Sequence, residues 1–443
     1  WMVGKWHMGV PGPMDRGFQH YFGYKDFGAH SEGQWNAAKY VRLPATVKPE
    51  LNYETGRFYA TDVFTDYACE LLRQARTDKA KPWFLYLAHS SPHFPLQAPQ
   101  ASIDRNMATY RRGWDVLRAE RLERMKKLGL IPATATLPAR ALVPVDRDDI
   151  ANGYAGQPNP AWESLSADRR EDLARRMATF AAMVEHVDRG IGRILTDLEA
   201  SGELANTLIL FTSDNGACYE WGPFGFDSAS RTGKTTLHAG EQLAQMGQAG
   251  SFSSYGSGWA NLGNTPLAMY KHFCNEGGIS SPLIAHWPQG IPAERHGKLE
   301  KQPGHLIDVM ATAVDLSGAT YPATFENHRI LPMEGLSLRP AFLGQPLHRV
   351  KPIFWEHEGN RAVRSGPWKA VMKLKGNWEL YNLDEDRTEQ HDLIGINKAV
   401  AGLLIQQWNE WAASSFVDPW TGPARNNWGE EPRAGKKAGA KQK

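Results

Sequence analysis

The chain has 443 residues and a formal net charge of +2, with 42% hydrophobic and 22% charged residues. This balance is typical of a globular protein, and the length exceeds what one hydrophobic core usually serves, so we predict a large domain and a smaller one. Apolar runs fall well short of the roughly 20 residues that cross a bilayer, which excludes a membrane span in this sequence. The last twelve residues hold five Lys and Arg and no acid, so the rest of the chain sums to −3. We interpret this tail as solvated and disordered rather than as a nucleic-acid site.

The first quarter of the chain predicts loops, one helix and one strand. Residues 1–50 are rich in Gly, Pro and aromatic residues, and we expect loops around an active face there. Apolar residues at helical spacing predict a helix over 59–72. The continuous apolar run 83–88 is typical of a buried strand, and His89 and His93 follow at its exit.

The middle of the chain predicts a long helix that leads into a second buried strand. An apolar stripe over 166–202 is followed by the apolar run 207–212. The order strand, helix, strand predicts that 83–88 and 207–212 pair in parallel. We assign no chemistry to residues 104–165, which we expect at the periphery, and we expect a functional or disordered loop over 217–265.

The last third of the chain changes to short strands and turns. A strand at 283–285 and a helix over 305–316 precede the change, and several short strands and a helix at 400–411 follow it. This order predicts an α/β fold with a large, mostly parallel sheet between helices and a smaller C-terminal domain of antiparallel sheet plus helix. The predicted units are a large domain over 1–328, a smaller domain over 329–420 and the basic tail over 421–443.

A carboxylate and a carboxamide stand side by side where the strand 207–212 ends. Ser213-Asp214-Asn215-Gly216 places two oxygen donors at the carboxyl end of a strand, where ligands gather in open α/β sheets. Oxygen ligands are those that calcium prefers. Because Asp, Asn and Gly are also common turn formers, these four residues alone favour an ordinary turn, and the metal hypothesis depends on the motifs elsewhere.

Five segments of the chain together resemble the arylsulfatases of the alkaline-phosphatase-like superfamily. They are Gly4-Lys5-Trp6-His7, 82–95, 213–216, Glu276-Gly277-Gly278-Ile279 and 378–383, in the family's order across nearly the whole chain. The resemblance implies an alkaline-phosphatase-like fold that hydrolyses sulfate esters with a formylglycine nucleophile beside calcium, which is favoured over magnesium. It also implies a sulfated small molecule or glycan as substrate and a periplasmic or secreted location.

The resemblance implies roles for four residues around the sulfate group. Asp214 and Asn215 would be calcium ligands. Lys5 would contact a sulfate oxygen and the formylglycine hydrate, and His7 would act as the base on the hydroxyls of the nucleophile. The logic is electrostatic, because a sulfate-ester transition state carries spread negative charge that a divalent cation and fixed lysines stabilise.

Two further residues would act on the leaving oxygen. By the resemblance, His93 and Lys271 would stabilise or protonate this oxygen, and imidazole suits the role because it titrates near neutrality. His272 and Lys234 remain alternatives to Lys271, since each would place a cation nearby.

Three residues are candidates for contact with the rest of the substrate or for support of the site. His89 would contact substrate, although a hydrogen-bonded supporting histidine is an equally good reading. Most of the sixteen tryptophans are expected in the core. Trp259, in a Ser/Gly-rich segment, and Trp35, in an aromatic one, are the two candidate substrate contacts.

The expected nucleophile is absent from the sequence. In the family it is made from a cysteine in a Cys-x-(Pro/Ala)-x-Arg motif that lies upstream of the Gly-Lys-Trp-His segment. Cys69 is followed by Arg73, but position 71 is Leu and the stretch belongs to a predicted helix, where cysteine packs as a small hydrophobe. We therefore expect an N-terminally truncated sulfatase. Rival hypotheses are a phosphonate or phosphate ester hydrolase of the same superfamily and a non-catalytic remnant that binds sulfated glycans.

Overall fold

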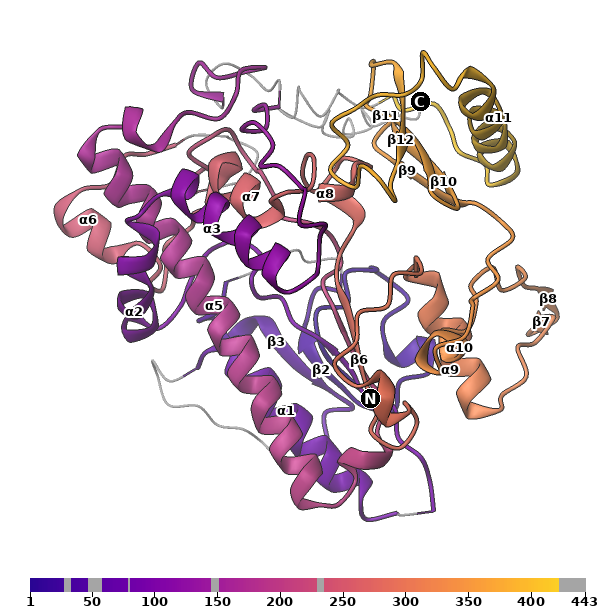
Figure 1. Ribbon diagram of the computed structural model, residues 1–443. Coiled ribbons are helices and arrows are strands. Elements are labelled where there is room, and N and C mark those ends of the chain that lie inside the picture. Colours follow the sequence, from indigo (N-terminus) through magenta and orange to yellow (C-terminus); the bar gives the residue numbers. More distant parts are fainter. Residues whose placement is uncertain (28–32, 47–57, 79, 145–150, 229–234, 422–443) are drawn as a thin grey trace, which may run out of the picture.

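The computed structural model in Figure 1 describes residues 1–27, 33–46, 58–78, 80–144, 151–228 and 235–421. The basic tail predicted over 421–443 lies, except for its first residue, outside the described residues. No helix in the described part is long and apolar enough to cross a membrane.

The main sheet has four strands in the order β3-β2-β1-β4. Its central strand β1 pairs in parallel with both β2 and β4, and β3 pairs with β2 in the antiparallel direction. The bounds are β1 (Met2–Gly4), β2 (Tyr21–Tyr24), β3 (Tyr40–Leu43) and β4 (Tyr86–Ala88). The prediction of loops over 1–50 is therefore wrong. Strands of three or four residues between Gly and Pro turn signals are too short to show a period of their own.

A second pair of strands, β5 (Ile209–Thr212) and β6 (Leu283–His286), is antiparallel. The predicted parallel pairing of the strands at 83–88 and 207–212 is wrong, because β4 pairs with β1 and β5 with β6. Both β4 and β5 border one cavity of about 5250 Å³, hereafter the central cavity. A helix between two strands in the sequence therefore does not by itself make those strands neighbours in one sheet.

Two long helices form where the apolar stripes predicted them, and one of them packs on the main sheet. Helix α1 (Ala60–Ala75) packs on β1 and β2, and α5 (Ala167–Ala200) packs on α1 (Figure 1). The Ser166 hydroxyl caps α5 by accepting a hydrogen bond from the backbone N–H of Arg169. Helix α1 therefore supports the strand β1 from which Lys5 and His7 follow.

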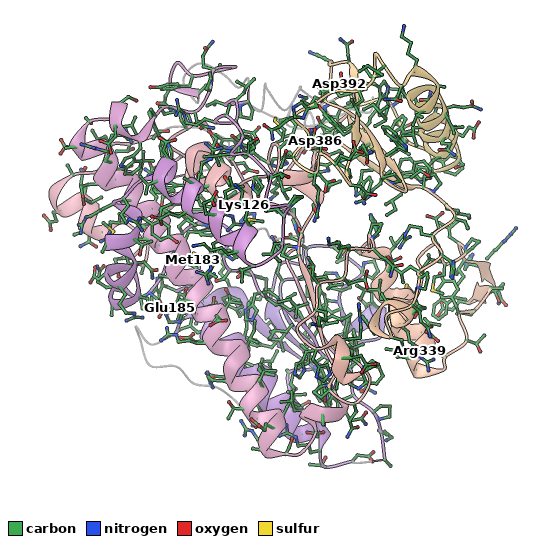
Figure 2. All side chains as sticks on the ribbon, viewed as in Figure 1. Lys126, Met183, Glu185, Arg339, Asp386 and Asp392 are labelled. Carbon is green, nitrogen blue, oxygen red and sulfur yellow. The ribbon has the colours of Figure 1, made fainter. Side chains whose placement is uncertain are left out.

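Helix α5 also joins α1, which packs on the sheet, to helix α2 (Gln100–Tyr110). It packs on α2, where Arg105 pairs with Glu185 of α5 at 2.6 Å. Figure 2 labels Met183 and Glu185 on this helix, and the Met183 side chain is fully buried. The helix therefore contributes both apolar packing and an ion pair to this junction.

The segments 104–165 and 217–265 form much of the largest core, contrary to the predictions of a peripheral region and a long loop. They contain α3 (Trp114–Lys127), α6 (Gly240–Gln245) and α7 (Gly256–Asn264). Trp114, Trp162 and Trp259 are buried and meet with ring centroids 4.8–5.3 Å apart. Large rings scattered without a helical or strand period gave no signal of this packing in the sequence.

The C-terminal part is a second unit, as predicted, with an antiparallel sheet in the order β12-β11-β10-β9 and a helix on it. Short elements lead into it: α9 (Ile307–Ser317), β7 (Thr324–Phe325), β8 (His328–Arg329) and α10 (Arg339–Phe342). The unit itself comprises β9 (Ile353–His357), β10 (Asn360–Ser365), β11 (Trp368–Met372), β12 (Trp378–Asn382) and α11 (Lys398–Ser414). Figure 2 labels Asp386 and Asp392 there, and Asp392 accepts a hydrogen bond from the backbone of Leu380 at 2.9 Å.

A buried ion cluster joins this second sheet to α8 (Glu276–Ile279). Lys369 of β11 is fully buried, and its Nζ lies 2.9 Å from carboxylate oxygens of both Glu276 and Glu389. The backbone N–H of Glu276 donates to Glu389 at 2.9 Å. Because the two carboxylates share one buried ammonium, the cluster ties α8 to the C-terminal sheet.

We predict that Lys369→Met strongly destabilises the protein, because it leaves two carboxylates buried without their cation. The expected loss in the free energy of unfolding is about 3–5 kcal/mol, measured by urea denaturation. Lys373→Met is the matched control, since its partially exposed side chain pairs with Glu379 at 3.3 Å and should cost at most about 1 kcal/mol. Equal losses in the two variants would contradict a stabilising role for the cluster.

Candidate active site

Lys5 and His7 leave the end of β1 beside the end of β4. Gly4 has φ +112°, and a Cβ there would lie 2.0 Å from the carbonyl oxygen of Ala88, so only glycine fits this approach. The backbone N–H of Lys5 donates to the same oxygen at 2.9 Å. His7 has φ +58°, and both Lys5 and His7 line the central cavity. The close approach to Ala88 thus explains the glycine of the Gly-Lys-Trp-His motif, and Lys5 brings a cation to the cavity.

His93 lies in the loop after β4 and also lines the central cavity. Its Nδ1 is 2.8 Å from the carbonyl oxygen of Phe94, which can only accept, so Nδ1 carries the proton. Burial, and then the charges of Lys271 and Lys5, lower the pKa of His93 to about 3. The expectation that this imidazole titrates near neutrality does not hold for the protein without ligand, because burial and two neighbouring cations oppose its protonation.

His89 also faces the central cavity, at the exit of β4. Both ring nitrogens are buried and have no hydrogen-bond partner among the described residues. Burial lowers the pKa of His89 to about 4, so the ring is neutral at physiological pH. The hydrogen-bonded supporting role is not seen in the described part of the chain, and substrate contact stays a prediction.

Asp214 and Asn215 stand at the end of β5, on a turn that packs against α8. A Cβ at Gly216 would lie only 1.7 Å from the carbonyl oxygen of Gly277, and the N–H of Gly216 donates to the carbonyl of Gly278 at 3.0 Å. The Asn215 amide nitrogen donates to the carbonyl of Gly216 at 2.9 Å, so its oxygen is the atom available to a cation. Two motifs far apart in sequence are thus joined backbone to backbone.

Lys271 approaches the same turn from a third segment. Its backbone N–H donates to the carbonyl of Ala217 at 3.0 Å, and the neighbouring residues Met269 and His272 have φ +64° and +86°. Of the two alternatives for this cation, His272 is engaged by Glu220 at 2.6 Å, and Lys234 lies outside the described residues. The left-handed residues on either side of Lys271 bend the chain so that this residue lines the central cavity.

Electrostatics show that Lys5, His93, Asp214 and Lys271 lie close together. Burial, and then the charge of Lys271, lower the pKa of Lys5 to about 8, against the opposing effect of the Asp214 carboxylate. The same two lysines lower the pKa of His93. Two half-buried cations that repel each other form a site suited to an anion, since a bound anion relieves both the repulsion and the loss of hydration.

The donor set of Asp214 and Asn215 fits a hard divalent cation in type. Calcium takes about six to eight oxygen ligands, and these two side chains supply part of such a shell. They line the central cavity, so further ligands can reach the ion from the open side. The set thus suits an ion shared between this turn and other groups.

The predicted substrate contact of Trp259 is wrong, because the ring lies in the core and does not line the central cavity. The Trp259 side chain is fully buried in α7, and its indole N–H donates to the carbonyl of Leu173 at 2.8 Å. Trp35 packs on Tyr59 with ring centroids 4.9 Å apart and does not line the central cavity. Both rings serve packing, the commonest role of a large aromatic side chain.

A group of ionisable residues beside Lys271 was not predicted from the sequence. His272 meets Glu220 of the segment after β5, and His357 and Glu358 of the β9–β10 turn. We call these four residues the His–Glu cluster. They come from three segments without a shared motif spacing, so only the fold brings them together.

Comparison with known proteins identifies the family. A sequence model described as Sulfatase matches residues 1–319. An uncharacterized sulfatase of Schizosaccharomyces pombe is 31% identical over 434 residues, covering 94% of this chain and 74% of the relative. An arylsulfatase of Klebsiella aerogenes is 32% identical over 351 residues, covering 76% of this chain and 69% of the relative.

A solved structure supports the fold. A protein in complex with its substrate D-glucosamine-2-N,6-O-disulfate matches with a TM-score of 0.54 at 19% identity, covering 95% of this chain and 80% of that one. The mixed sheet with its helices and the separate antiparallel C-terminal sheet agree with this likeness. The chain therefore belongs to the sulfatase family, enzymes of the alkaline-phosphatase-like fold that hydrolyse sulfate esters.

Proposed function

We propose that this chain forms the sulfate-binding and leaving-group side of a calcium-dependent sulfatase site with a formylglycine nucleophile. The observation that carries the proposal is the convergence of Lys5, Lys271 and His93 on the turn of Asp214. These residues come from separate segments of the chain and face one cavity. A sulfate ester is a tetrahedral anion, and a cluster of fixed cations beside a metal-type donor pair matches its charge.

In the proposed reaction water replaces the alcohol on sulfur, so that the bond between sulfur and the ester oxygen breaks. Lys5 and Lys271 hold the sulfate oxygens, and His7 takes up a proton on the nucleophile's side. The ester oxygen leaves as an alcohol and needs a proton, which His93 or Lys271 supplies. The negative charge of bound substrate offsets the two lysines, so it raises the pKa of His93 toward the range where imidazole acts as an acid.

Asp214 and Asn215 would hold calcium through their side-chain oxygens. Bound there, the cation would neutralise charge on the sulfate oxygens. Lys5, close enough to Asp214 for the carboxylate to affect its pKa, would bind the same group from the other side. The carboxylate therefore serves the cation and the lysine together.

The nucleophile is proposed to come from polypeptide beyond these 443 residues, because no cysteine of the sequence stands in a Cys-x-(Pro/Ala)-x-Arg motif. Cys69 is buried in α1, and burial raises its pKa. Burial raises the pKa of Cys218 and of Cys274 to about 12, so neither is a thiolate at neutral pH.

The central cavity supports an occupant larger than the substrate. At about 5250 Å³ it far exceeds the roughly 300–1,000 Å³ of small-molecule pockets. Large apolar side chains of both sheets are exposed in its lining. They include Tyr86 of β4, Phe211 of β5 and Ile284 of β6, which are 43–58% exposed. Polypeptide that brings the nucleophile would cover these side chains.

A sulfated small molecule or glycan is the proposed substrate class. The related fold solved with D-glucosamine-2-N,6-O-disulfate accepts a sulfated sugar, and the central cavity here is open enough to admit one. The ordinary requirements for this class are anion binding at the sulfate and polar contacts around the sugar ring. His89, with both ring nitrogens facing no protein partner in the described residues, is proposed as one such contact.

We predict that this chain binds inorganic sulfate and that binding weakens as the pH rises through about 8, where Lys5 loses its proton. Isothermal titration at pH 6.5 and pH 9 should show up to about a 10-fold loss of affinity, because about a tenth of Lys5 is still protonated one pH unit above its pKa. Lys5→Arg should remove most of this pH dependence, since arginine stays protonated.

Lys398→Met, at an exposed position on α11, is the control for that experiment and should bind sulfate like the unaltered chain. Sulfate affinity that is equal at both pH values, or unaffected by Lys5→Met, would contradict the assignment of Lys5. Tighter binding of a phosphonate than of sulfate would favour the related phosphonate ester hydrolase hypothesis instead.

We predict that calcium raises the thermal stability of the chain and that Asp214→Ala abolishes this effect. At a free calcium concentration of 100 times Kd the expected gain is about 2.7 kcal/mol. Asp418→Ala, an exposed aspartate near the end of the described chain, should leave the gain intact. If the Asp214→Ala protein is still stabilised by calcium, this carboxylate is not a ligand.

A further inference from the structure

We propose that the His–Glu cluster is a binding site for a divalent transition-metal ion of the zinc class. The ligands are His272 Nδ1, His357 Nε2 and a Glu358 carboxylate oxygen. The site is separate from the Asp214 turn and uses nitrogen as well as oxygen donors. Imidazole and carboxylate together suit zinc and its neighbours in the first transition row, whereas calcium takes oxygen ligands.

The geometry of the three donor atoms fits one ion. Glu358 Oε2 lies 3.5 Å from His272 Nδ1 and 3.6 Å from His357 Nε2, and all three atoms lie within 4.8 Å of one another. Tetrahedral zinc with bonds of about 2.0–2.2 Å places its ligands about 3.3–3.6 Å apart. The donors therefore need only small side-chain movements to coordinate one ion.

Glu220 orients the central histidine. Its carboxylate lies 2.6 Å from Nε2 of His272, and the two side chains are only 8% and 5% exposed. A carboxylate that accepts the N–H on one side of an imidazole fixes the ring and directs the other nitrogen to a metal. Glu220 and Nε2 are too close to be two separate ligands of the same tetrahedral ion, so Glu220 acts on the metal through His272.

The backbone holds the two halves of the site in register. Asn360 Nδ2 donates to the backbone carbonyl of His272 at 3.0 Å and to that of His357 at 3.1 Å. The turn itself is tight, with Glu358 and Gly359 at φ +55° and +81°. One amide thus bridges the β9–β10 turn and the segment of Lys271, which places the ligands from both before an ion arrives.

The proposed metal site is open to solvent and lies next to Lys271. His357 is 54% exposed, and both His272 and His357 line the central cavity. An ion with three protein ligands keeps a fourth position for water or another ligand. Because His272 follows Lys271 directly, the ion would fix the segment that carries this lysine to the C-terminal sheet.

The test is metal binding by the untagged chain, with Zn²⁺ and Co²⁺ as probes. We expect one equivalent of Zn²⁺ after dialysis, measured by elemental analysis, and visible absorption bands of tetrahedral Co²⁺. His357→Ala should remove both signals, and Glu220→Gln should weaken affinity roughly 10-fold to 100-fold while the stoichiometry stays at one. His328→Ala, at an exposed position on β8, is the control and should bind like the unaltered chain.

The outcomes separate this site from the proposed calcium site. Asp214→Ala should leave Co²⁺ absorption unchanged, because it lies outside the His–Glu cluster. Circular dichroism in the presence of a chelator would show that the His357→Ala protein is folded. A chain that binds no Zn²⁺, or one whose bound Zn²⁺ survives His357→Ala, would overturn the proposal and leave the cluster as a hydrogen-bonded network.

Discussion

Close contact between two glycine turns is the constraint on which the site depends. Gly216 follows the metal-type pair directly, and its N–H is bonded to Gly278 of α8 at 3.0 Å. Any side chain at Gly216 would collide with the carbonyl of Gly277. Because Lys369 and its two carboxylates hold α8 to the C-terminal sheet, the second sheet also positions the turn at the end of β5. The smaller unit is therefore part of the structure of the site.

The positive charges of the candidate site suit a bound anion. Burial and the charge of Lys271 lower the pKa of Lys5, and burial together with both lysines lowers the pKa of His93. This arrangement is unfavourable in the free protein, since two desolvated cations share one region. An anion reverses the balance, so binding and the protonation state of His93 are coupled. Electrostatic stabilisation of this kind needs no rearrangement when the reaction begins.

The sequence predicted the family and the long elements well. The apolar stripes of α1 and α5 have a helical period that can be read directly, and the short strands of the C-terminal sheet are separated by clear turns. It could not predict the strands within 1–50, which are too short for a period. Trp259 was misread because burial of a ring among other rings leaves no local trace. The His–Glu cluster was missed for a related reason, since its members come from three segments and meet only in the fold.

The strands β4 and β5 do not pair with each other, although both lead to residues of the candidate site. The rule that a helix crossover joins parallel strands says nothing about what lies between them. Here the central cavity lies between them. Even so, Lys5 follows β1, His89 and His93 follow β4, and Asp214 follows β5, each at the carboxyl end of its strand. Ligand sites in α/β folds form at these ends. The site therefore depends on the direction in which each strand runs and not on which strands are neighbours.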